Sequence, residues 1–325
     1  GNTPLHWLLT TLAQSTSSSH EDVPYAIEQF TEMLLGRSTE ETLCPLLVKN
    51  KEGLTPFHFC ALHHVPTPIV QILIRSHFAP KALNITDMHM ATPLHIICAS
   101  SNLSTQVQTI GLLGAHSQEA CIKKDDKGHT PLHIAVQNPQ CTDTVIKAVI
   151  DINPKAAKIE NNKGRLPFHL AIKNRSGESI LNALLRASPK AVKSIFEGNN
   201  GVIHEMCQYK APSSIIELAL HLFPEGARLE NKFHNLPLHV ATAYQCDLST
   251  VKALVKSFPQ ACTHQNKRKD VPLHYAIIYK RAEAVIDFLI KAAPSSVMIP
   301  NEKDQSPLDL SKENGTGDVA IQALD

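Results

Sequence analysis

The hexapeptide Thr130-Pro131-Leu132-His133-Ile134-Ala135 decides the fold of this 325-residue chain, because close variants of it recur along the whole sequence. The pattern Thr-Pro-Leu-His, or a variant of it, ends at eight further positions: His6, His58, His95, His169, His204, His239, His274 and Asp309. The first interval between these positions is 52 residues long, and all later intervals lie between 35 and 38. A fixed period of this length is typical of repeat architectures. Nine units are therefore predicted, starting near residues 1, 53, 90, 128, 164, 199, 234, 269 and 304.

The motif predicts the start of a helix. Thr is a favoured N-cap residue, and Pro suits the first helical position because the N–H that it lacks would have no partner there. A second segment of each unit has apolar residues at helical spacing, for example in 144–152, 179–187 and 250–258. Each unit is therefore predicted to be a hairpin of two helices, which must stack on its neighbours to bury its apolar face.

These residues resemble the ankyrin repeat, whose signature is Thr-Pro-Leu-His-x-Ala, over essentially the whole chain. The resemblance implies an all-α fold: an ankyrin-repeat solenoid of stacked helical hairpins with projecting turns, in a curved right-handed array that forms a single domain over 1–325. It also implies that the motif His is structural, because its side chain hydrogen-bonds the motif Thr and the backbone of the adjoining unit. The residues given this role are His6, His58, His95, His133, His169, His204, His239 and His274.

The units depart from the family pattern in three ways. Pro recurs at 35-residue intervals from Pro154 to Pro294 where the family has Gly, so the loop after the second helix is expected to be built differently. The long first interval predicts a polar insertion near 14–22. Loss of the Gly from the projecting turn predicts an altered turn geometry, because only Gly takes a positive φ without cost. The replacing residues are Met90, Asn199, His234, Lys269 and Asp304.

Composition excludes several classes of protein. With 43% hydrophobic and 19% charged residues, the chain is too apolar for intrinsic disorder, yet no apolar run reaches the roughly 18 residues that a membrane span needs. Its 8 Cys contain no Cys-x-x-Cys pair, which indicates reduced thiols and an intracellular, cytoplasmic location, with the nucleus left open. The chain opens on Gly1 in the middle of a repeat unit, so we expect it to be part of a longer protein.

The 18 His invite a metal-site or acid–base interpretation, and their spacing argues against it. Within 58–64, His and Cys crowd one helix, but only Cys60 and His64 lie four residues apart and could share a face. Sequence motifs for nucleotide binding, for a serine nucleophile elbow and for a zinc-protease helix are absent. We therefore predict no enzyme activity, no metal, no cofactor and no small-molecule substrate.

Three of the five Tyr recur in phase, because Tyr209, Tyr244 and Tyr279 each lie five residues after the motif His of consecutive units. In ankyrin domains this position faces the concave groove where partners commonly bind, and the three rings are expected to stack. Tyr is enriched at binding centres, but repeat phase alone would also produce a packing ladder, so both interpretations stay open. Neighbouring residues that complete the predicted partner-binding set are Lys173, Asn174, Arg175, Lys210 and Lys280.

Charge is distributed unevenly along the chain. Residues 163–300 hold 18 Lys and Arg against 10 Asp and Glu, a balance of +8, whereas 1–162 hold 11 against 14. The resemblance to ankyrin repeats implies a protein–protein interaction module, an adaptor or scaffold, that binds a partner along the groove. The positive balance favours an acidic or phosphorylated segment as that partner. The alternative is a regulatory or targeting region of a larger enzyme or channel whose catalytic part lies outside this chain. Nucleic acid is not favoured, because the basic cluster 267–269 fills one turn rather than a broad stripe.

Overall fold

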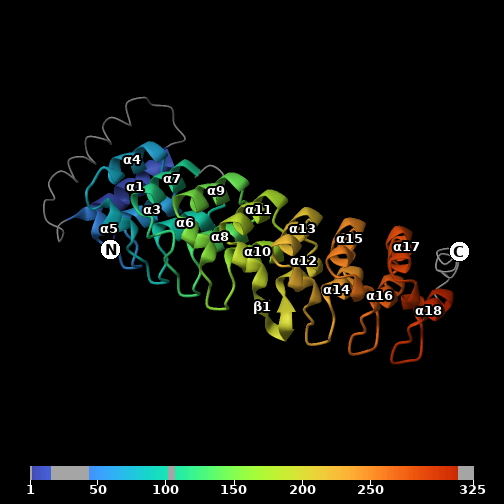
Figure 1. The fold of residues 1–325 in the computed structure, drawn as a ribbon. Helices are drawn as coiled ribbons and strands as arrows, with labels where there is room; N and C mark the ends of the chain where they lie inside the picture. Colours follow the sequence, from blue (N-terminus) through green and yellow to red (C-terminus); the bar gives the residue numbers. More distant parts are fainter. Residues whose placement is uncertain (1, 16–43, 102–106, 314–325) are drawn as a thin grey trace. The chain divides into compact units, whose positions relative to one another are not determined.

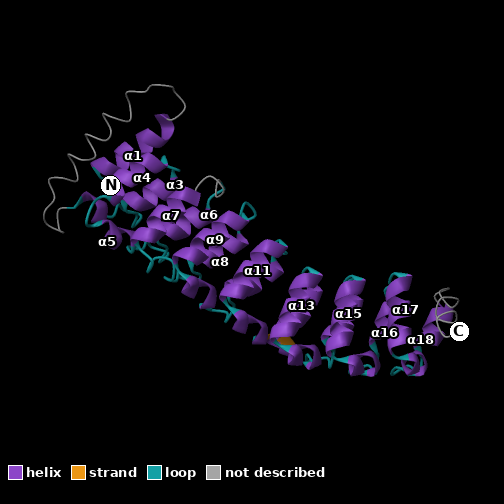
Figure 2. Cartoon of the chain, turned by 45° about the horizontal axis from the view of Figure 1, so that its top comes forward, coloured by secondary structure: helices purple, strands orange, loops and turns teal. Residues whose placement is uncertain are grey.

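A computed structural model of the chain describes residues 2–15, 44–101 and 107–313. Helices dominate these residues, and the strands within them form one two-stranded pair (Figure 2). The chain divides into two compact units, Gly1–Leu170 and Ala171–Asp325, which are described separately. The predicted insertion near 14–22 falls, beyond Ser15, outside the described residues. The single domain over 1–325 and the handedness of the array stay predictions.

The N-terminal unit is a stack of helical hairpins. We call the first helix of each hairpin, which starts at the motif Pro, the inner helix, and the second the outer helix. The inner helices are α1 (Pro4–Ser15), α3 (Pro56–Leu62), α6 (Pro93–Ala99), α8 (Pro131–Gln137) and α10 (Pro167–Lys173), which runs across the unit boundary. The outer helices are α4 (Thr67–Ile74), α7 (Val107–His116) and α9 (Asp143–Ile152). Short elements between hairpins are η2 (Pro45–Leu47), α5 (Ala79–Leu83) and η4 (Pro154–Lys158).

The C-terminal unit follows the same plan. Its inner helices are α12 (Val202–Gln208), α14 (Pro237–Ala243), α16 (Pro272–Ile278) and α18 (Pro307–Glu313), and its outer helices are α11 (Glu178–Ala187), α13 (Ser213–Leu222), α15 (Leu248–Ser257) and α17 (Glu283–Ala292). In Figure 1, α12, α14 and α16 lie between the projecting turns and the outer helices α13, α15 and α17. The outer helices begin and end within two residues of the predicted segments 144–152, 179–187 and 250–258. The all-α solenoid of stacked hairpins with projecting turns is therefore confirmed.

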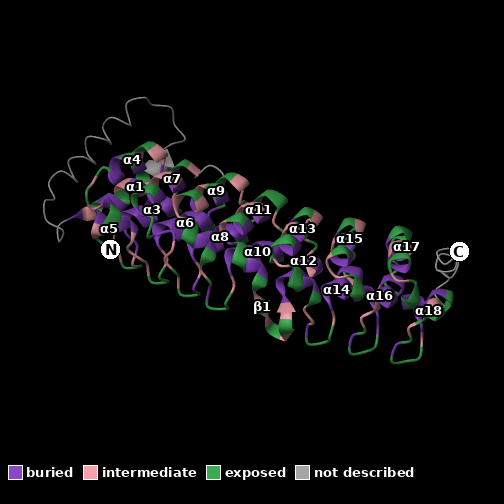
Figure 3. Ribbon diagram, in the orientation of Figure 1, coloured by how far each residue is buried: buried purple, intermediate pink, exposed green. Residues whose placement is uncertain are grey.

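Apolar side chains are buried where one hairpin packs against the next. In the C-terminal unit, Met206 and Ala241 on the inner helices and Ile216 and Leu254 on the outer helices have at most 1% of their surface exposed. Figure 3 shows the same distribution, with buried residues on the helix faces that meet and exposed residues at the turn tips. Each hairpin thus completes the core of its neighbour, which is how repeat proteins gain stability.

The Pro that replaces the family Gly starts a short 3₁₀ helix after five of the outer helices, α9, α11, α13, α15 and α17. In addition to η4, these are η5 (Pro189–Lys193), η7 (Pro224–Arg228), η8 (Pro259–Thr263) and η9 (Pro294–Met298). The residue before each Pro is extended, for example Phe258 with φ −147° and ψ 86°, because the Pro ring disfavours the helical conformation there. The outer helix must therefore end at this point, and the predicted difference in loop construction is confirmed.

The predicted change in turn geometry is wrong. Met90, His234, Lys269 and Asp304 adopt φ values between 55° and 60°, so they keep the left-handed conformation that Gly53, Gly128 and Gly164 adopt elsewhere. A side chain eight residues before the motif His imposes this conformation. The Oδ1 atom of Asn266, for example, accepts hydrogen bonds from the N–H groups of Arg268 (2.8 Å) and Asp270 (3.0 Å). The equivalent residues are Asn50, Asp87, Asp125, Asn161, Asn231 and Asn301, each of which accepts the same two bonds.

The unit of the decayed motif Gly-Val-Ile-His departs from this pattern. Phe196 occupies the position of the turn Asn or Asp and cannot accept the two bonds. Backbone pairing replaces the side-chain hydrogen bonds in this turn: β1 (Ile195–Phe196) pairs with the antiparallel β2 (Asn200–Gly201). The connecting η6 (Glu197–Asn199) holds two residues in the left-handed region, Gly198 and Asn199.

Candidate functional site

The three predicted Tyr occupy equivalent positions in the C-terminal unit. Tyr209, Tyr244 and Tyr279 are the C-cap residues of the inner helices α12, α14 and α16. Tyr244 and Tyr279 are 45% and 48% exposed, and Tyr209 is half-buried. These rings thus present surface to solvent at the same end of three successive helices.

The residue after each of these Tyr lies in the left-handed region. Lys210, Gln245 and Lys280 have φ values of 57°, 62° and 48°, and Arg175 at the end of α10 has 55°. This conformation lets the chain turn back on itself, so that the N–H of Ala211 donates to the carbonyl oxygen of Met206 (2.8 Å). A left-handed residue other than Gly is strained. This left-handed residue nevertheless recurs in four successive repeats, and three of the four residues carry a positive charge.

All the charged members of the predicted partner-binding set are exposed. Lys173 ends α10, Asn174 and Arg175 follow it, and Lys210 and Lys280 follow α12 and α16 at the equivalent level. The C-terminal unit thus brings the Tyr of three repeats and the basic residues of three repeats to the same ends of its inner helices. We call Tyr209, Tyr244 and Tyr279 with these five residues the Tyr–Lys surface.

The three Tyr rings do not form the expected stack. Tyr279 stacks on Tyr275 of its own helix, with ring centroids 6.0 Å apart and planes at 2°. Within the described residues, no ring of Tyr209, Tyr244 or Tyr279 contacts the ring of the next repeat. Each Tyr is therefore a separate platform. Sequence reasoning did not single out Tyr275. This residue belongs to the scaffold, because its hydroxyl is hydrogen-bonded to Nδ2 of Asn266 (3.1 Å).

The motif His makes the two kinds of hydrogen bond that the resemblance implies. In the unit of His58, Nδ1 accepts from the N–H of Thr55 (3.1 Å) and lies 2.7 Å from the Thr55 hydroxyl. Its Nε2 is 3.1 Å from the carbonyl oxygen of Ala91 in the next unit. The corresponding Nε2 contacts of other units are His6 to Leu54, His95 to His129, His133 to Arg165, His204 to Asn235, His239 to Asp270 and His274 to Gln305. His169 accepts at Nδ1 from the N–H of Leu166 (3.0 Å).

These hydrogen bonds require a neutral imidazole. An Nδ1 atom that accepts from a backbone N–H carries no proton, so Nε2–H is the donor to the next unit. Burial favours the same state, because desolvation lowers the pKa of His58 and of His133 to about 4 and that of His239 to about 3. Both nitrogens of His58 are thus engaged, and the Cys60 thiol beside it is buried. Across residues 2–15, 44–101 and 107–313, no group of three or more His, Cys, Asp or Glu is arranged to hold a metal ion.

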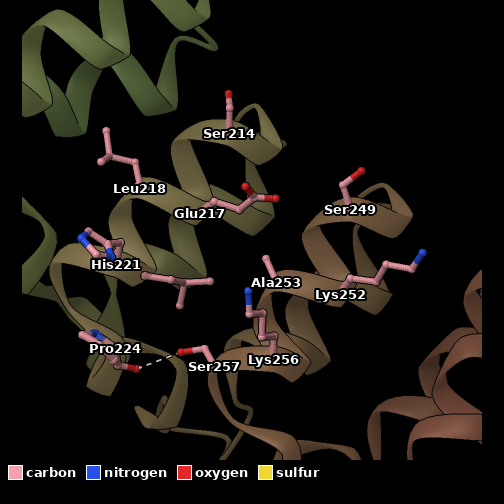
Figure 4. A pocket seen from close by; sticks show the side chains of 11 residues that line it. Ser214, Glu217, Leu218, His221, Pro224, Ser249, Lys252, Ala253, Lys256 and Ser257 are labelled. Carbon is pink, nitrogen blue, oxygen red and sulfur yellow. Dashed lines mark hydrogen bonds between the residues drawn. The ribbon is translucent and has the colours of Figure 1, made fainter.

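A separate groove of about 860 Å³ lies between the outer helices α13 and α15 (Figure 4). Figure 4 shows Glu217 and Lys256 directed into the space between the two helices. Ser257 closes one end by donating to the carbonyl oxygen of Pro224 (3.5 Å). The lining holds one carboxylate, Glu217, and two ammonium groups, Lys252 and Lys256. The groove also lies in the other helix layer from the Tyr–Lys surface, so the two are distinct.

Comparison with known proteins agrees with this geometry. A sequence profile described as "Ankyrin repeats (3 copies)" matches residues 97–194. The chain thus contains ankyrin repeats. The crystal structure of the ankyrin repeat domain of Bcl-3, a unique member of the IkappaB protein family, is similar to it with a TM-score of 0.55. The two are 22% identical, over 74% of this chain and 99% of the Bcl-3 chain, which shows a shared fold. No curated protein matches the chain by sequence.

Ankyrin repeats are generally protein–protein interaction modules that bind other proteins, and their fold is typically non-catalytic. In this ankyrin repeat protein, every helix within the described residues is too short or too polar to span a membrane.

Sequence reasoning missed the side chains that shape the projecting turns and the end of α14. The Asn or Asp eight residues before the motif His recurs with the repeat period, so a search at that offset would have found it. Arg281 carries no such signal. Its guanidinium donates to the carbonyl oxygens of Thr242 (2.5 Å) and Ala243 (2.7 Å), where it caps the end of α14 directly before Tyr244.

Proposed function

We propose that this ankyrin repeat protein is an adaptor or scaffold that binds an acidic or phosphorylated segment of another protein on the Tyr–Lys surface. The observation that carries the proposal is the recurrence of exposed Tyr and basic residues at one position of successive inner helices. An extended segment can contact several repeats at once, because the same end of each inner helix faces it.

The aromatic part of the surface supports contact with a protein segment. A half-exposed Tyr offers a large ring with a polar tip at low cost in conformational entropy. Tyr244 and Tyr279 have this exposure, and the backbone turn after each helix fixes their position. An open Tyr that is held in place is typical of a binding hot spot.

The basic part of the surface supports a negatively charged ligand. Arg175, Lys210 and Lys280 project from left-handed positions, and Lys173 extends the same edge. Several cations at the rim of an interface attract an anionic segment and raise its association rate. Salt screens such exposed charges, so binding should weaken as ionic strength rises.

Peptide selection tests the proposal while the partner is still unidentified. We expect the protein to enrich acidic or phosphorylated sequences from a displayed peptide library. Calorimetry with a selected peptide should then show at least a hundredfold weaker binding, about 3 kcal/mol, when Tyr209, Tyr244 and Tyr279 are all replaced by Ala. Replacing Lys173, Arg175, Lys210 and Lys280 by Gln should weaken binding and remove most of its salt dependence.

Matched controls separate binding from folding. A charge control replaces four exposed Lys away from the surface with Gln, namely Lys190, Lys252, Lys256 and Lys291. An apolar control is Phe233→Ala, which removes an exposed side chain from a turn. Both controls should leave affinity unchanged, and the Tyr variant should keep the circular dichroism spectrum and melting midpoint of the parent. Unchanged affinity in the Tyr variant, or collapse of its fold, would show that the Tyr pack rather than bind.

The proposal also covers the cellular location of the protein and the alternative that it is part of a larger enzyme or channel. Reduced thiols support a cytoplasmic location, since all eight Cys are free. Fractionation of cells that express the tagged chain tests this location. The alternative, a regulatory or targeting region of a larger enzyme or channel, stays a prediction that the complete transcript would test.

A further inference from the structure

Two thiols from adjacent repeats meet beside α12 and α14. Cys207 lies in the last turn of α12 and is fully buried, whereas Cys246 lies in the loop after α14 and is partly exposed. The Cys246 thiol donates to the carbonyl oxygen of Cys207 (3.3 Å), which places the Cys246 sulfur against the residue that carries the second thiol. Neither thiol belongs to the Tyr–Lys surface as defined above, although Lys210 of that surface lies close enough to Cys246 to act on its charge.

The backbone holds the pair together. The left-handed residue Gln245 turns the chain after α14, so that the N–H of Cys246 donates to the carbonyl oxygen of Ala241 (3.1 Å). Cys246 is thereby brought back against the preceding inner helix. The contact of the Cys246 thiol with residue Cys207 thus follows from the repeat fold.

The surroundings of Cys246 favour its thiolate. A hydrogen bond from the Cys207 side chain is the largest cause that lowers the pKa of Cys246, and the positive charges of Lys210 and Arg281 act in the same direction. Burial and the Asp247 carboxylate oppose them. Elsewhere burial raises the pKa of the thiol, to about 11 for Cys121 and Cys262 and to about 12 for Cys141.

We propose that Cys246 and Cys207 form a reversible dithiol oxidation site that reacts with a hydroperoxide. The Cys246 thiolate attacks the peroxide O–O bond; with hydrogen peroxide and one proton this yields a Cys246 sulfenic acid and one water. The Cys207 sulfur then attacks the Cys246 sulfur, and a second water leaves with the Cys207 proton. Two thiols are oxidised by two electrons in total, one peroxide is reduced, and the product is a disulfide between adjacent repeats.

Peptide mapping of the intact chain tests this site. After limited hydrogen peroxide treatment, alkylation and trypsin digestion, we expect peptide 194–210, which holds Cys207, to be linked to peptide 233–252, which holds Cys246. Dithiothreitol should separate the two peptides. Cys262, alone in peptide 257–267, is the internal control and should be modified at least about tenfold more slowly than Cys246.

Single substitutions separate the roles of the two thiols. Cys246→Ser should abolish the link and spare Cys207 from oxidation. Cys207→Ser, or Cys207→Ala if the buried hydroxyl impairs folding, should instead leave a Cys246 sulfenic acid that dimedone traps. Cys262→Ser should change neither result. Absence of the linked peptide in the parent, oxidation of Cys262 as fast as Cys246, or no dimedone adduct in both Cys207 variants would each overturn the proposal.

Discussion

The motif His residues use both imidazole nitrogens, which ties their protonation state to the stability of the fold. In the units of His133 and His204, for example, Nδ1 accepts from the backbone at the start of its own helix, and Nε2 faces the carbonyl oxygen of the next unit. A proton on Nδ1 would break the first bond and place a charge at the N-terminal end of a helix, where the macrodipole disfavours it. One side chain therefore links helix capping to the stacking of repeats.

Acid should destabilise the protein through these residues. The folded pKa values of His58 and His133 are about 4, below an unfolded value of about 6.5, so the unfolded chain binds more protons as pH falls. Stability is thus complete above pH 6.5 and declines toward pH 4, by about 1 to 2 kcal/mol per fully buried His between pH 7 and pH 5. Urea denaturation at the two pH values measures this, and an unchanged midpoint would contradict it.

The left-handed residues after the inner helices give a second prediction at this scale. Gln245, with φ 62°, occupies the position that Gly prefers after a helix. We expect Gln245→Gly to raise the free energy of unfolding by about 1 kcal/mol, because Gly removes the steric cost of this conformation. Gln245→Ala is the control and should give little or no gain, since Ala keeps the Cβ. Equal effects of Gly and Ala on the urea midpoint would count against the argument.

At the scale of the element, the projecting turn depends on a single side chain. Asn266→Ala removes the acceptor for two backbone N–H groups and the Nδ2 contact to Oδ1 of Asn235 (2.8 Å). We expect a loss of about 2 kcal/mol or more, because buried donors are left unpaired. Asn266→Asp keeps the acceptor oxygen and should lose less. Urea denaturation of the two variants checks the order, and equal losses would contradict the role of the acceptor.

The helical hairpins were predictable from sequence, because a capped helix start and apolar residues at helical spacing are local signals. The turns were not predicted correctly. An expectation based on Gly alone overlooked that the Asn266 side chain stabilises the left-handed conformation of Lys269 from three residues away. Propensity describes one residue at a time, whereas this turn is set by side-chain hydrogen bonds.

The candidate surface was predictable in position but not in detail. Repeat phase placed Tyr209, Tyr244 and Tyr279 at the ends of three inner helices, as the structure has them. Repeat phase could not predict that the three rings do not stack on one another, because stacking depends on the distance between repeats and on ring orientation. It also could not give the contact between Cys207 and Cys246, because these residues occupy different positions in their units.

At the scale of the whole molecule, stability should be distributed over the two compact units. Leu254 in α15 and Leu94 in α6 are each 1% exposed, so replacing either by Ala should cost about 2 to 5 kcal/mol. In repeat proteins such a loss acts mainly on neighbouring hairpins. Trp7, the single Trp of the chain, reports on the N-terminal unit.

The urea midpoints measured by fluorescence and by circular dichroism should therefore differ in these variants. Leu254→Ala should lower the urea midpoint seen by circular dichroism and leave the Trp7 fluorescence midpoint nearly unchanged. Leu94→Ala should lower the fluorescence midpoint. Coincident transitions in both variants would indicate that the chain unfolds as one cooperative block.

The side-chain-held turns also affect how the sequence can vary. Asn266 supplies the side-chain hydrogen bonds that shape its turn, whereas the side chains of the tip residues Lys267, Arg268 and Lys269 are exposed. Tip sequences can therefore be exchanged by mutation, or grafted by design, while the scaffold beneath them is preserved. Recognition at the tips can diversify from one repeat to the next with little effect on foldedness.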